Sequence, residues 1–275
     1  MKTLLKRFSL KGHSRLSIVY LVLRLSVVLV IFDQLRSRNF ENIFLCILTL
    51  VLFFIPSFIE KRIHIDIPDT LEIIMLLFIF SAEILGEIKE YYLLFPDWDT
   101  ILHTLNGFLA AAIGLSLIDI LNKNDKFSIN MSPLFVSLVS FCFSMTIGVV
   151  WELFEFSMDK YFGFDMQKDT LINTIRTVTL NPTGANVPIT VNVDSLMVNG
   201  IPWNSYIDIG LIDTMMDLFV NFVGAIVFAV FGFFYIKNRG KSTFLSRFIL
   251  TSNLIQPESG ELEITILECE SSEIK

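Results

Sequence analysis

The chain has 275 residues, of which 53% are hydrophobic, 27 are phenylalanine and only 18% are charged. The mean hydropathy is +0.64, a composition that excludes an ordinary water-soluble protein and is typical of an integral membrane protein. Much of the formal net charge of −7 comes from the C-terminal tail, and no basic patch indicates a nucleic-acid partner.

Apolar runs long enough to cross the hydrocarbon core of a bilayer, which takes about 20 residues of helix, occur six times. In chain order, the predicted spans are residues 16–33, 41–59, 67–88, 99–121, 133–158 and 209–236. No small-residue cleavage site follows the first run, so we expect it to be a helix and not a cleaved signal peptide. The sequence therefore predicts an all-α membrane protein, a bundle of six transmembrane helices.

Lys and Arg, which cytoplasmic loops retain, fall mainly on one side of this topology. The other side has only Arg36, Arg38, Lys89, Lys160, Lys168 and Arg176. We therefore expect a multi-pass protein of the cell membrane with both termini in the cytoplasm. Trp98, Trp151 and Trp203 fall near the predicted outer boundaries, as residues of an aromatic belt do.

One loop is long, from about residue 159 to 208, and this topology puts it outside the cell. Its β-branched runs, separated by Asn-Pro, Thr-Gly and Asn-Gly, predict one or two small β-hairpins that form an extracytoplasmic cap over the outer mouth of the bundle. We expect one transmembrane domain over residues 1–250, including this loop, and an acidic, disordered cytoplasmic tail over 251–275.

Polar side chains recur at helical spacing in the last four predicted helices. These stripes are Glu83 and Glu87; Asp99, His103 and Asn106; Glu152, Glu155 and Asp159; and Asp213, Asp217 and Asn221. Their spacing puts the members of each stripe on one face of a helix. Because the helices alternate in direction, all four stripes fall in the outer halves at a similar depth, which predicts one shared site.

Ionised carboxylates at that depth are costly unless they are protonated or neutralised by a cation. Carboxylates with one imidazole and no thiolate suit a divalent metal ion such as Mg²⁺, Ca²⁺, Mn²⁺, Fe²⁺ or Zn²⁺, and the sequence does not choose among them. The candidate metal ligands are His103, Asp99, Glu155, Asp213 and Asp217. Glu152 and Glu155 are the candidate catalytic residues, as general bases.

Structural roles are open alternatives for several of these residues. Asp99 fits a helix N-cap, and His103 fits a hydrogen-bonded histidine inside a bundle. Wet interfacial positions equally suit Glu87, Asp159 and Asp213. Away from the stripes, Arg24 and Glu72 fit either an ion pair between neighbouring helices or a role in transport.

At WDTILH, WELFEF and IDTMMDLFVNFVGA the chain resembles an uncharacterised family of bacterial integral membrane proteins, often called YjdF-like, over residues 95–235. The family pattern has an Asp-x-x-x-His pair, a helix with Glu-x-x-Glu, and an Asp-x-x-x-Asp segment before Gly-Ala. The matching positions are Asp99 and His103, Glu152 and Glu155, and Asp213 and Asp217. The chain departs from the pattern at Ile212, where the family usually has Trp, and in its long 159–208 loop. Asp169, in FDMQKD, is a second candidate for the place of Asp213. The family has no established activity, so the resemblance implies a site in a bacterial membrane protein and no reaction.

Three functions fit these observations. The first is a metal-dependent hydrolase or transferase acting on a lipid-linked or envelope substrate at the outer leaflet, with membrane lipid as its surroundings. The second is a cation- or proton-coupled transporter, ranked lower because the inner helix halves are mostly apolar and no inverted repeat is visible. The third is a non-catalytic protein that binds a partner through its cap or tail.

Overall fold

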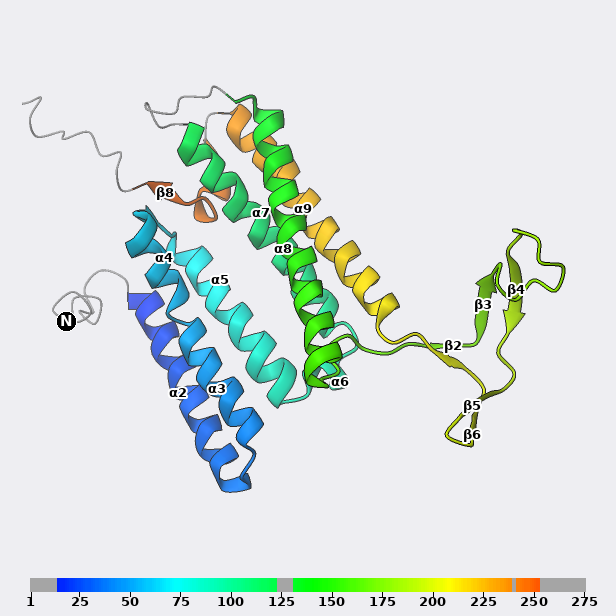
Figure 1. Cartoon of the computed structure of the whole chain (residues 1–275). Helices are drawn as coiled ribbons and strands as arrows, with labels where there is room; N and C mark the ends of the chain where they lie inside the picture. The colour runs from blue at the N-terminus through cyan, green and yellow to red at the C-terminus, as the bar shows by residue number, and fades with distance from the viewer. Residues whose placement is uncertain (1–13, 123–130, 239–240, 253–275) are drawn as a thin grey trace, which may run out of the picture. The chain divides into compact units, whose positions relative to one another are not determined.

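The computed structural model describes residues 14–122, 131–238 and 241–252 and is mostly helical (Figure 1). Within these ranges, five helices are long and apolar enough to cross a membrane. They are α2 (Ser14–Ser37), α3 with α4 (Phe40–Leu52 and Ile55–Ile63), α7 (Trp98–Asn122), α8 (Pro133–Phe162) and α9 (Leu211–Lys237). Each lies within a few residues of a predicted span. The predicted acidic tail lies outside the described residues from residue 253 onward.

The third predicted span, 67–88, is built differently from the others. α5 (Asp69–Phe80) passes directly into η1 (Ser81–Ile88), a π-helix. At the end of η1, the Lys89 amide donates to the Ile84 carbonyl oxygen, five residues back, at 3.0 Å. Such wide turns are rare and often found at functional sites. That α5 and η1 together form a sixth membrane span stays a prediction.

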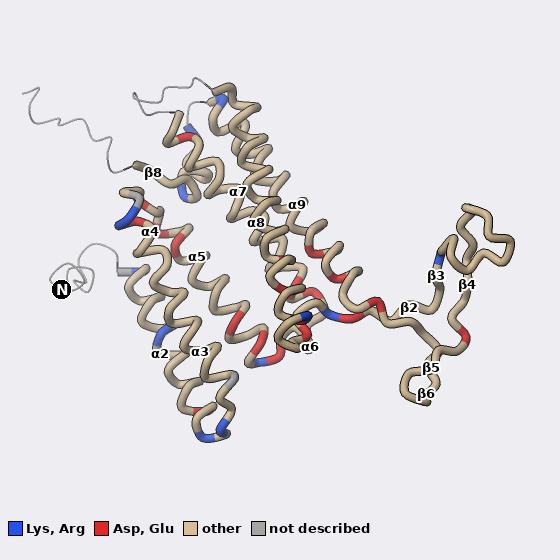
Figure 2. The backbone as a smooth tube through the Cα atoms, in the orientation of Figure 1, with Lys and Arg blue, Asp and Glu red and all other residues tan. Residues whose placement is uncertain are grey.

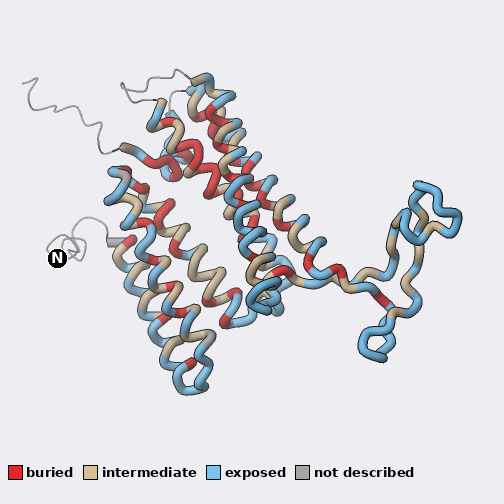
Figure 3. The backbone as a smooth tube through the Cα atoms, viewed as in Figure 1, coloured by how far each residue is buried: buried red, intermediate tan, exposed pale blue. Residues whose placement is uncertain are grey.

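The chain divides into two compact units, which are described separately. Of the residues that the structure describes, the first unit comprises 14–98, 112–122, 131–140, 229–238 and 241–252, and the second comprises 99–111 and 141–228. In the first unit, buried side chains of α2, α3, α5 and η1 form an apolar core that includes Val27, Leu76 and Ile84. Exposed positions, among them Leu21 and Phe32, run along α2 (Figure 3). An apolar exposed face is expected for a helix that is solvated by lipid.

The C-terminal part of the first unit returns to the end of α4. There, β1 (Ile65–Asp66) pairs antiparallel with β8 (Thr251–Ser252), which follows the short 3-10 helix η2 (Leu245–Arg247). Next to β8, the Leu250 amide donates to the Ser116 hydroxyl on α7 at 3.0 Å. The pairing of β1 with β8 joins segments that are nearly 200 residues apart in the sequence.

Arg24 and Glu72, the two charged residues outside the stripes, both contact Tyr20 in the first unit. Glu72 is fully buried and accepts a hydrogen bond from the Tyr20 hydroxyl at 2.7 Å. The Arg24 guanidinium carbon lies 4.8 Å from the ring centroid of Tyr20 and 4.8 Å from that of Phe54. The tyrosine therefore links the two charges, with its ring beside the cation and its hydroxyl on the carboxylate.

The long loop after α8 forms small two-stranded antiparallel sheets, which confirms the prediction of β-hairpins. The pairs are β2 (Leu171–Ile172) with β7 (Tyr206–Ile207), β3 (Thr174–Thr177) with β4 (Ile189–Asn192), and β5 (Leu196–Val198) with β6 (Ile201–Trp203). The β5–β6 turn consists of Asn199 and Gly200, both at positive φ, the conformation of a tight type I′ hairpin turn. That these sheets cap the outer mouth of the bundle stays a prediction.

Two glycines let α7 and α9 approach closely inside the second unit. A Cβ atom added at Gly107 would collide with the Asn221 carbonyl oxygen, and one added at Gly224 would collide with the Thr104 carbonyl oxygen. Beside this contact, the Asn106 side-chain amide donates to the Asn221 side-chain oxygen at 3.0 Å. Small residues permit backbone contact between helices in a membrane, and side-chain amides then bond across it.

Gly224→Ala is expected to lower the free energy of unfolding by about 1–3 kcal/mol, the usual cost of overpacking. The added methyl group collides with the Thr104 carbonyl oxygen, and a backbone atom cannot move aside by a change of side-chain rotamer. Thermal unfolding of the detergent-purified protein measures the effect. Val223→Ile, which adds one methylene group at the neighbouring exposed position, is the control. Equal midpoints for both variants would contradict the close approach.

Candidate functional site

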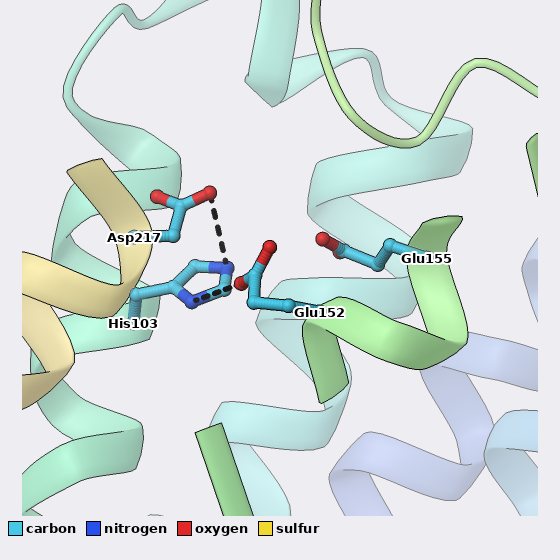
Figure 4. Close-up of side chains that lie close together, drawn as sticks. All are labelled: His103, Glu152, Glu155 and Asp217. Carbon is cyan, nitrogen blue, oxygen red and sulfur yellow. Dashed lines mark ion pairs between the residues drawn. The ribbon is translucent and has the colours of Figure 1, made fainter. Parts of the chain in front are cut away.

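One buried cluster gathers four of the predicted site residues within the second unit. His103 comes from α7, Glu152 and Glu155 come from α8, and Asp217 comes from α9 (Figure 4). One possible ligand atom of each lies within 4.8 Å of those of the others, and all four residues are buried. Three helices therefore bring an imidazole and three carboxylates to one place.

The contact between α7 and α9 at Asn106 and Asn221 sets the relative positions of His103 and Asp217 along the two helices. His103 lies three residues before Asn106, and Asp217 lies four residues before Asn221, so both precede the asparagine pair by about one turn. The acidic residues of α9 occur only in its first turns, as Figure 2 shows. The hydrogen bond between the asparagines thus holds the imidazole and the carboxylate at one depth.

The imidazole of His103 has a carboxylate beside each of its nitrogen atoms. Its Nδ1 atom lies 3.7 Å from Glu152 Oε1, and its Nε2 atom lies 3.8 Å from Asp217 Oδ2. Asp99, one turn earlier on α7, has its Oδ1 atom 3.5 Å from the same Nε2 atom. These separations are longer than ordinary hydrogen bonds, so the side chains are gathered but not tightly bonded.

Three carboxylate oxygens of the cluster are buried and receive no hydrogen bond from the described residues: both oxygens of Glu152 and Oδ2 of Asp217. Burying a carboxylate in this way costs free energy unless another group compensates it. Glu155 differs, because its Oε1 atom accepts a hydrogen bond from the Trp151 indole at 2.8 Å. These oxygens could accept a ligand, and a cation fits their charge.

A second group of possible ligands shares one residue with the first. Asp99, Asp213 and Asp217 also offer oxygen atoms within 4.8 Å of one another, and Asp99 and Asp213 are only partly buried. The backbone amide of Lys168 donates to Asp213 Oδ2 at 2.7 Å. The structure thus brings together every candidate ligand and base that the sequence indicated, in two adjoining groups.

Other acidic residues of the stripes have different surroundings. Asp159 accepts hydrogen bonds from the backbone amides of Met166 at 2.6 Å and Gln167 at 2.9 Å, so it holds the loop after α8. Within the described chain, Asp213 and not Asp169 lies with Asp99 and Asp217. Glu83 and Glu87 belong to the first unit, and their membership of the shared site stays a prediction.

A cavity of about 550 Å³ adjoins the cluster at Glu152. Its other lining residues are Val149, Leu153, Phe156, Gln167, Tyr206, Asp208, Ile209, Gly210, Leu211, Thr214 and Leu218. Most of this lining is apolar, and one polar stretch is formed by Gln167, whose amide donates to the Thr214 hydroxyl. Sequence reasoning missed Gln167 and Thr214 as site residues, although Gln167 stands in the quoted FDMQKD segment. It also treated Trp151 only as an interfacial anchor.

Sequence reasoning also missed Asp208, whose carboxylate accepts hydrogen bonds from backbone amides at the start of α9. Its carboxylate accepts the backbone amides of Thr170 at 2.8 Å, Ile212 at 2.8 Å and Gly210 at 3.4 Å. Desolvation alone would raise the pKa of Asp208, but these amides outweigh it and hold the pKa below its ordinary value. An aspartate just before an apolar helical run is the sequence signal that identifies such a residue.

Asp208→Ala is expected to lower the free energy of unfolding by about 1–3 kcal/mol at pH 7, because amide donors lose a charged acceptor. The folded state has the lower pKa, so the stabilisation is present above the ordinary value of about 3.9 and disappears as the pH falls through the folded value. Thermal unfolding of parent and variant from pH 7 to pH 3 measures this, with Asp194→Asn, an exposed loop change, as the control. A difference that grows as the pH falls would contradict the assignment.

Comparisons with known proteins agree with these features. The chain matches a family described as "Predicted membrane protein (DUF2238)" over residues 17–238, a range that holds both groups of candidate ligands. It is also 29% identical to an uncharacterized protein of Thermotoga maritima over 150 residues, which are 53% of this chain and 75% of that protein. No solved structure matches the chain. The predicted membership of an uncharacterised membrane-protein family is confirmed, while the name YjdF-like is no part of the match. With its long apolar helices, the chain is a multi-pass membrane protein that belongs to the DUF2238 family.

Proposed function

We propose that the protein is a metal-dependent hydrolase or transferase that acts on a lipid-linked or envelope substrate within the membrane. The observation that carries the proposal is the buried group of His103, Glu152, Glu155 and Asp217, with carboxylate oxygens that receive no hydrogen bond. Ionisable residues inside a membrane-spanning segment are costly, and they usually mark a functional site.

The donor set fits a divalent cation. His103, Glu155 and Asp217 are the three ligands in this proposal, a set of imidazole and carboxylate donors that suits Zn²⁺, Mn²⁺ or Fe²⁺. Three protein ligands leave a coordination position for water or substrate, as in catalytic metal sites. The indole of Trp151 orients Glu155, in the way that outer hydrogen bonds usually orient metal ligands.

Glu152 is the general base in this proposal, because it belongs to the cluster and also lines the cavity. A bound ion supplies Lewis-acid chemistry, in that it polarises a carbonyl or phosphoryl oxygen and lowers the pKa of water. Glu152 takes a proton as the water oxygen attacks the carbon or phosphorus atom. The bond from that atom to the leaving oxygen then breaks, and the leaving oxygen receives the proton. In a transferase, an acceptor hydroxyl takes the place of water.

The cavity supports an amphipathic substrate. Leu153, Phe156 and Leu218 offer an apolar wall for a lipid chain, while Gln167 and Thr214 offer hydrogen-bonding groups near Glu152. Because α8 and α9 are membrane-spanning helices, membrane lipid is the natural surrounding molecule and the proposed partner class, and nucleic acid is not among the proposed partners.

The proposed topology has six crossings, with both termini in the cytoplasm of a bacterial cell. The sixth crossing is α5 with η1, whose 12 and 8 residues together reach the about 20 residues that a helix needs to span the hydrocarbon core. The distribution of Lys and Arg supports this orientation. It puts the cluster near the outer leaflet, within reach of lipid-linked envelope precursors.

Metal content and turnover test the function together. The full-length protein, purified in nanodiscs, is analysed by elemental mass spectrometry and then incubated with bacterial lipid extract, with and without chelator. Near-stoichiometric metal and a lipid product that forms only without chelator would support the proposal. A protein that holds no metal after exposure to Zn²⁺, Mn²⁺, Fe²⁺ and Ca²⁺ would exclude it.

Transport of a cation or proton is the second candidate, and Glu72 favours it. This carboxylate is fully buried beside Tyr20 in the first unit, where no catalytic role is assigned to it. Ion uptake by proteoliposomes, abolished in Glu72→Gln and accompanied by no lipid product, would favour transport over catalysis.

Trp151→Phe is expected to weaken metal binding about 10- to 100-fold, the usual effect of losing an outer hydrogen bond to a ligand. Phenylalanine keeps an aromatic ring on α8 but has no N–H group for Glu155. Titration of the metal-depleted protein with Mn²⁺ measures the affinity. Trp203→Phe, in strand β6 of the long loop, is the matched control. Equal affinities for both variants would show that the indole does not orient the ligand.

A further inference from the structure

We propose that the site holds two divalent cations and that Asp217 bridges them. The second ion is bound by Asp99, Asp213 and Asp217, next to the first ion at His103, Glu155 and Asp217. This inference rests on the proposed function, since it extends the same metal centre. A second ion also narrows the chemistry, because paired ions stabilise both the attacking and the leaving oxygen of a displacement.

The two groups of possible ligands have Asp217 in common. Asp217 belongs to both groups of possible ligands, and within each group the ligand atoms lie within 4.8 Å of one another. The Asp217 residue is 4% exposed, and its Oδ2 atom receives no hydrogen bond from the described residues. A carboxylate has two oxygens and can give one to each of two ions, which lie about 3.5–4 Å apart in two-metal sites.

The negative charge of the two groups together is larger than one divalent ion can balance. The first group contains the carboxylates of Glu152, Glu155 and Asp217, and the second group adds those of Asp99 and Asp213. When all are ionised, one divalent ion leaves three negative charges uncompensated in a membrane-spanning region, and two ions leave one. Unpaired charge at that depth is expensive, so a pair of ions fits the donor set better than a single ion.

Lys168 lies near the second group of possible ligands, and its ammonium group contacts Asp165. The Lys168 backbone amide donates to Asp213 Oδ2, which holds this carboxylate in place. The Lys168 ammonium group, however, donates to the Asp165 carbonyl oxygen and lies 3.9 Å from the Asp165 carboxylate. The described ion pairs of Asp99 and Asp217 are with the imidazole of His103, which also lies beside Glu152. The ion pairs of these carboxylates that the structure describes are therefore with histidine, so a metal ion would displace no described lysine or arginine ion pair.

The two ions are expected to bind with different affinities. The first group is buried throughout, whereas Asp99 and Asp213 are partly exposed and lie in the first turns of α7 and α9. A more exposed site is better hydrated and exchanges its ion more readily. The ion bound by Asp99 and Asp213 is therefore the one that a mild chelator removes first.

The test is the number of ions in the full-length parent protein and in three variants. Metal-depleted protein in nanodiscs is loaded with Mn²⁺, freed of excess metal, and analysed by elemental mass spectrometry and electron paramagnetic resonance. We expect two ions in the parent, with the spectrum of an exchange-coupled Mn²⁺ pair, and one uncoupled ion in Asp99→Asn and Asp213→Asn. Asp165→Asn removes a carboxylate from the same region, 75% exposed, and should keep the coupled pair.

Other results separate this inference from the function on which it rests. One uncoupled ion in the parent, retained in Asp213→Asn, would overturn the two-metal centre and leave the metal-dependent function in place. Two ions without exchange coupling would overturn the bridging role of Asp217. Two coupled ions in both Asp99→Asn and Asp213→Asn would overturn the assignment of these ligands. A parent that binds no metal would overturn the proposed function as well.

Discussion

Glu155→Gln is expected to bind Mn²⁺ more weakly than the parent protein by a factor of at least about 100. Loss of an outer hydrogen bond to a metal ligand already costs about 10- to 100-fold, and loss of the ligand itself costs more. Glutamine keeps the size of the side chain and can still accept from the Trp151 indole, so the fold is expected to persist. What it removes is one negative charge from the buried group of His103, Glu152 and Asp217.

Titration of the metal-depleted variant with Mn²⁺ measures this loss, and thermal unfolding without metal shows whether the variant is folded. Asp194→Asn, on the exposed loop, removes the same charge at a distance from any candidate ligand and should leave the affinity unchanged. If Glu155→Gln binds as tightly as Asp194→Asn, then Glu155 is not a ligand.

Glu152→Gln is expected to keep its metal and to lose turnover by about 10²- to 10⁴-fold, the usual contribution of a general base. Both Glu152 oxygens are free of hydrogen bonds from the described residues, and the residue lines the cavity, so the carboxylate is placed to take a proton from water. Glutamine has the same shape and cannot accept that proton.

Product formation from the lipid extract, followed by mass spectrometry, measures the loss of turnover, and elemental analysis of the same sample measures the metal. Leu153→Ala is the comparison variant. It removes part of the apolar wall, enlarges the cavity, and should change KM more than kcat. Loss of both metal and turnover in Glu152→Gln would make Glu152 a ligand and not the base.

Local patterns in the sequence were sufficient for the helices and for much of the candidate site. Apolar run length located α2, α7, α8 and α9 within a few residues, because length and hydropathy decide whether a helix spans lipid. Spacings of three and four residues identified His103, Glu152, Glu155 and Asp217, since they put side chains on one helix face. The Asn199-Gly200 signal likewise predicted a tight hairpin.

What the sequence did not predict depends on contacts between distant segments. The local sequence does not show that Asp159 accepts hydrogen bonds from the backbone amides of Met166 and Gln167. It also does not show that the Trp151 indole donates a hydrogen bond to Glu155. The change from α5 to η1 is also invisible in hydropathy, because both hydrogen-bonding patterns suit the same apolar residues. Which stripes meet is decided by glycine contacts such as Gly107 with Asn221, and not by the stripes themselves.

The pairing of β1 with β8 bears on the number of times the chain traverses the bilayer. Strands that share hydrogen bonds lie on one side of a membrane, so the traversals between Asp66 and Thr251 must be even in number. Among the described helices, α7, α8 and α9 supply three such traversals. Parity thus favours a fourth passage by α5 with η1. Cysteines introduced after Asp66 and after Ser252 should then react with an impermeant thiol reagent from the same side.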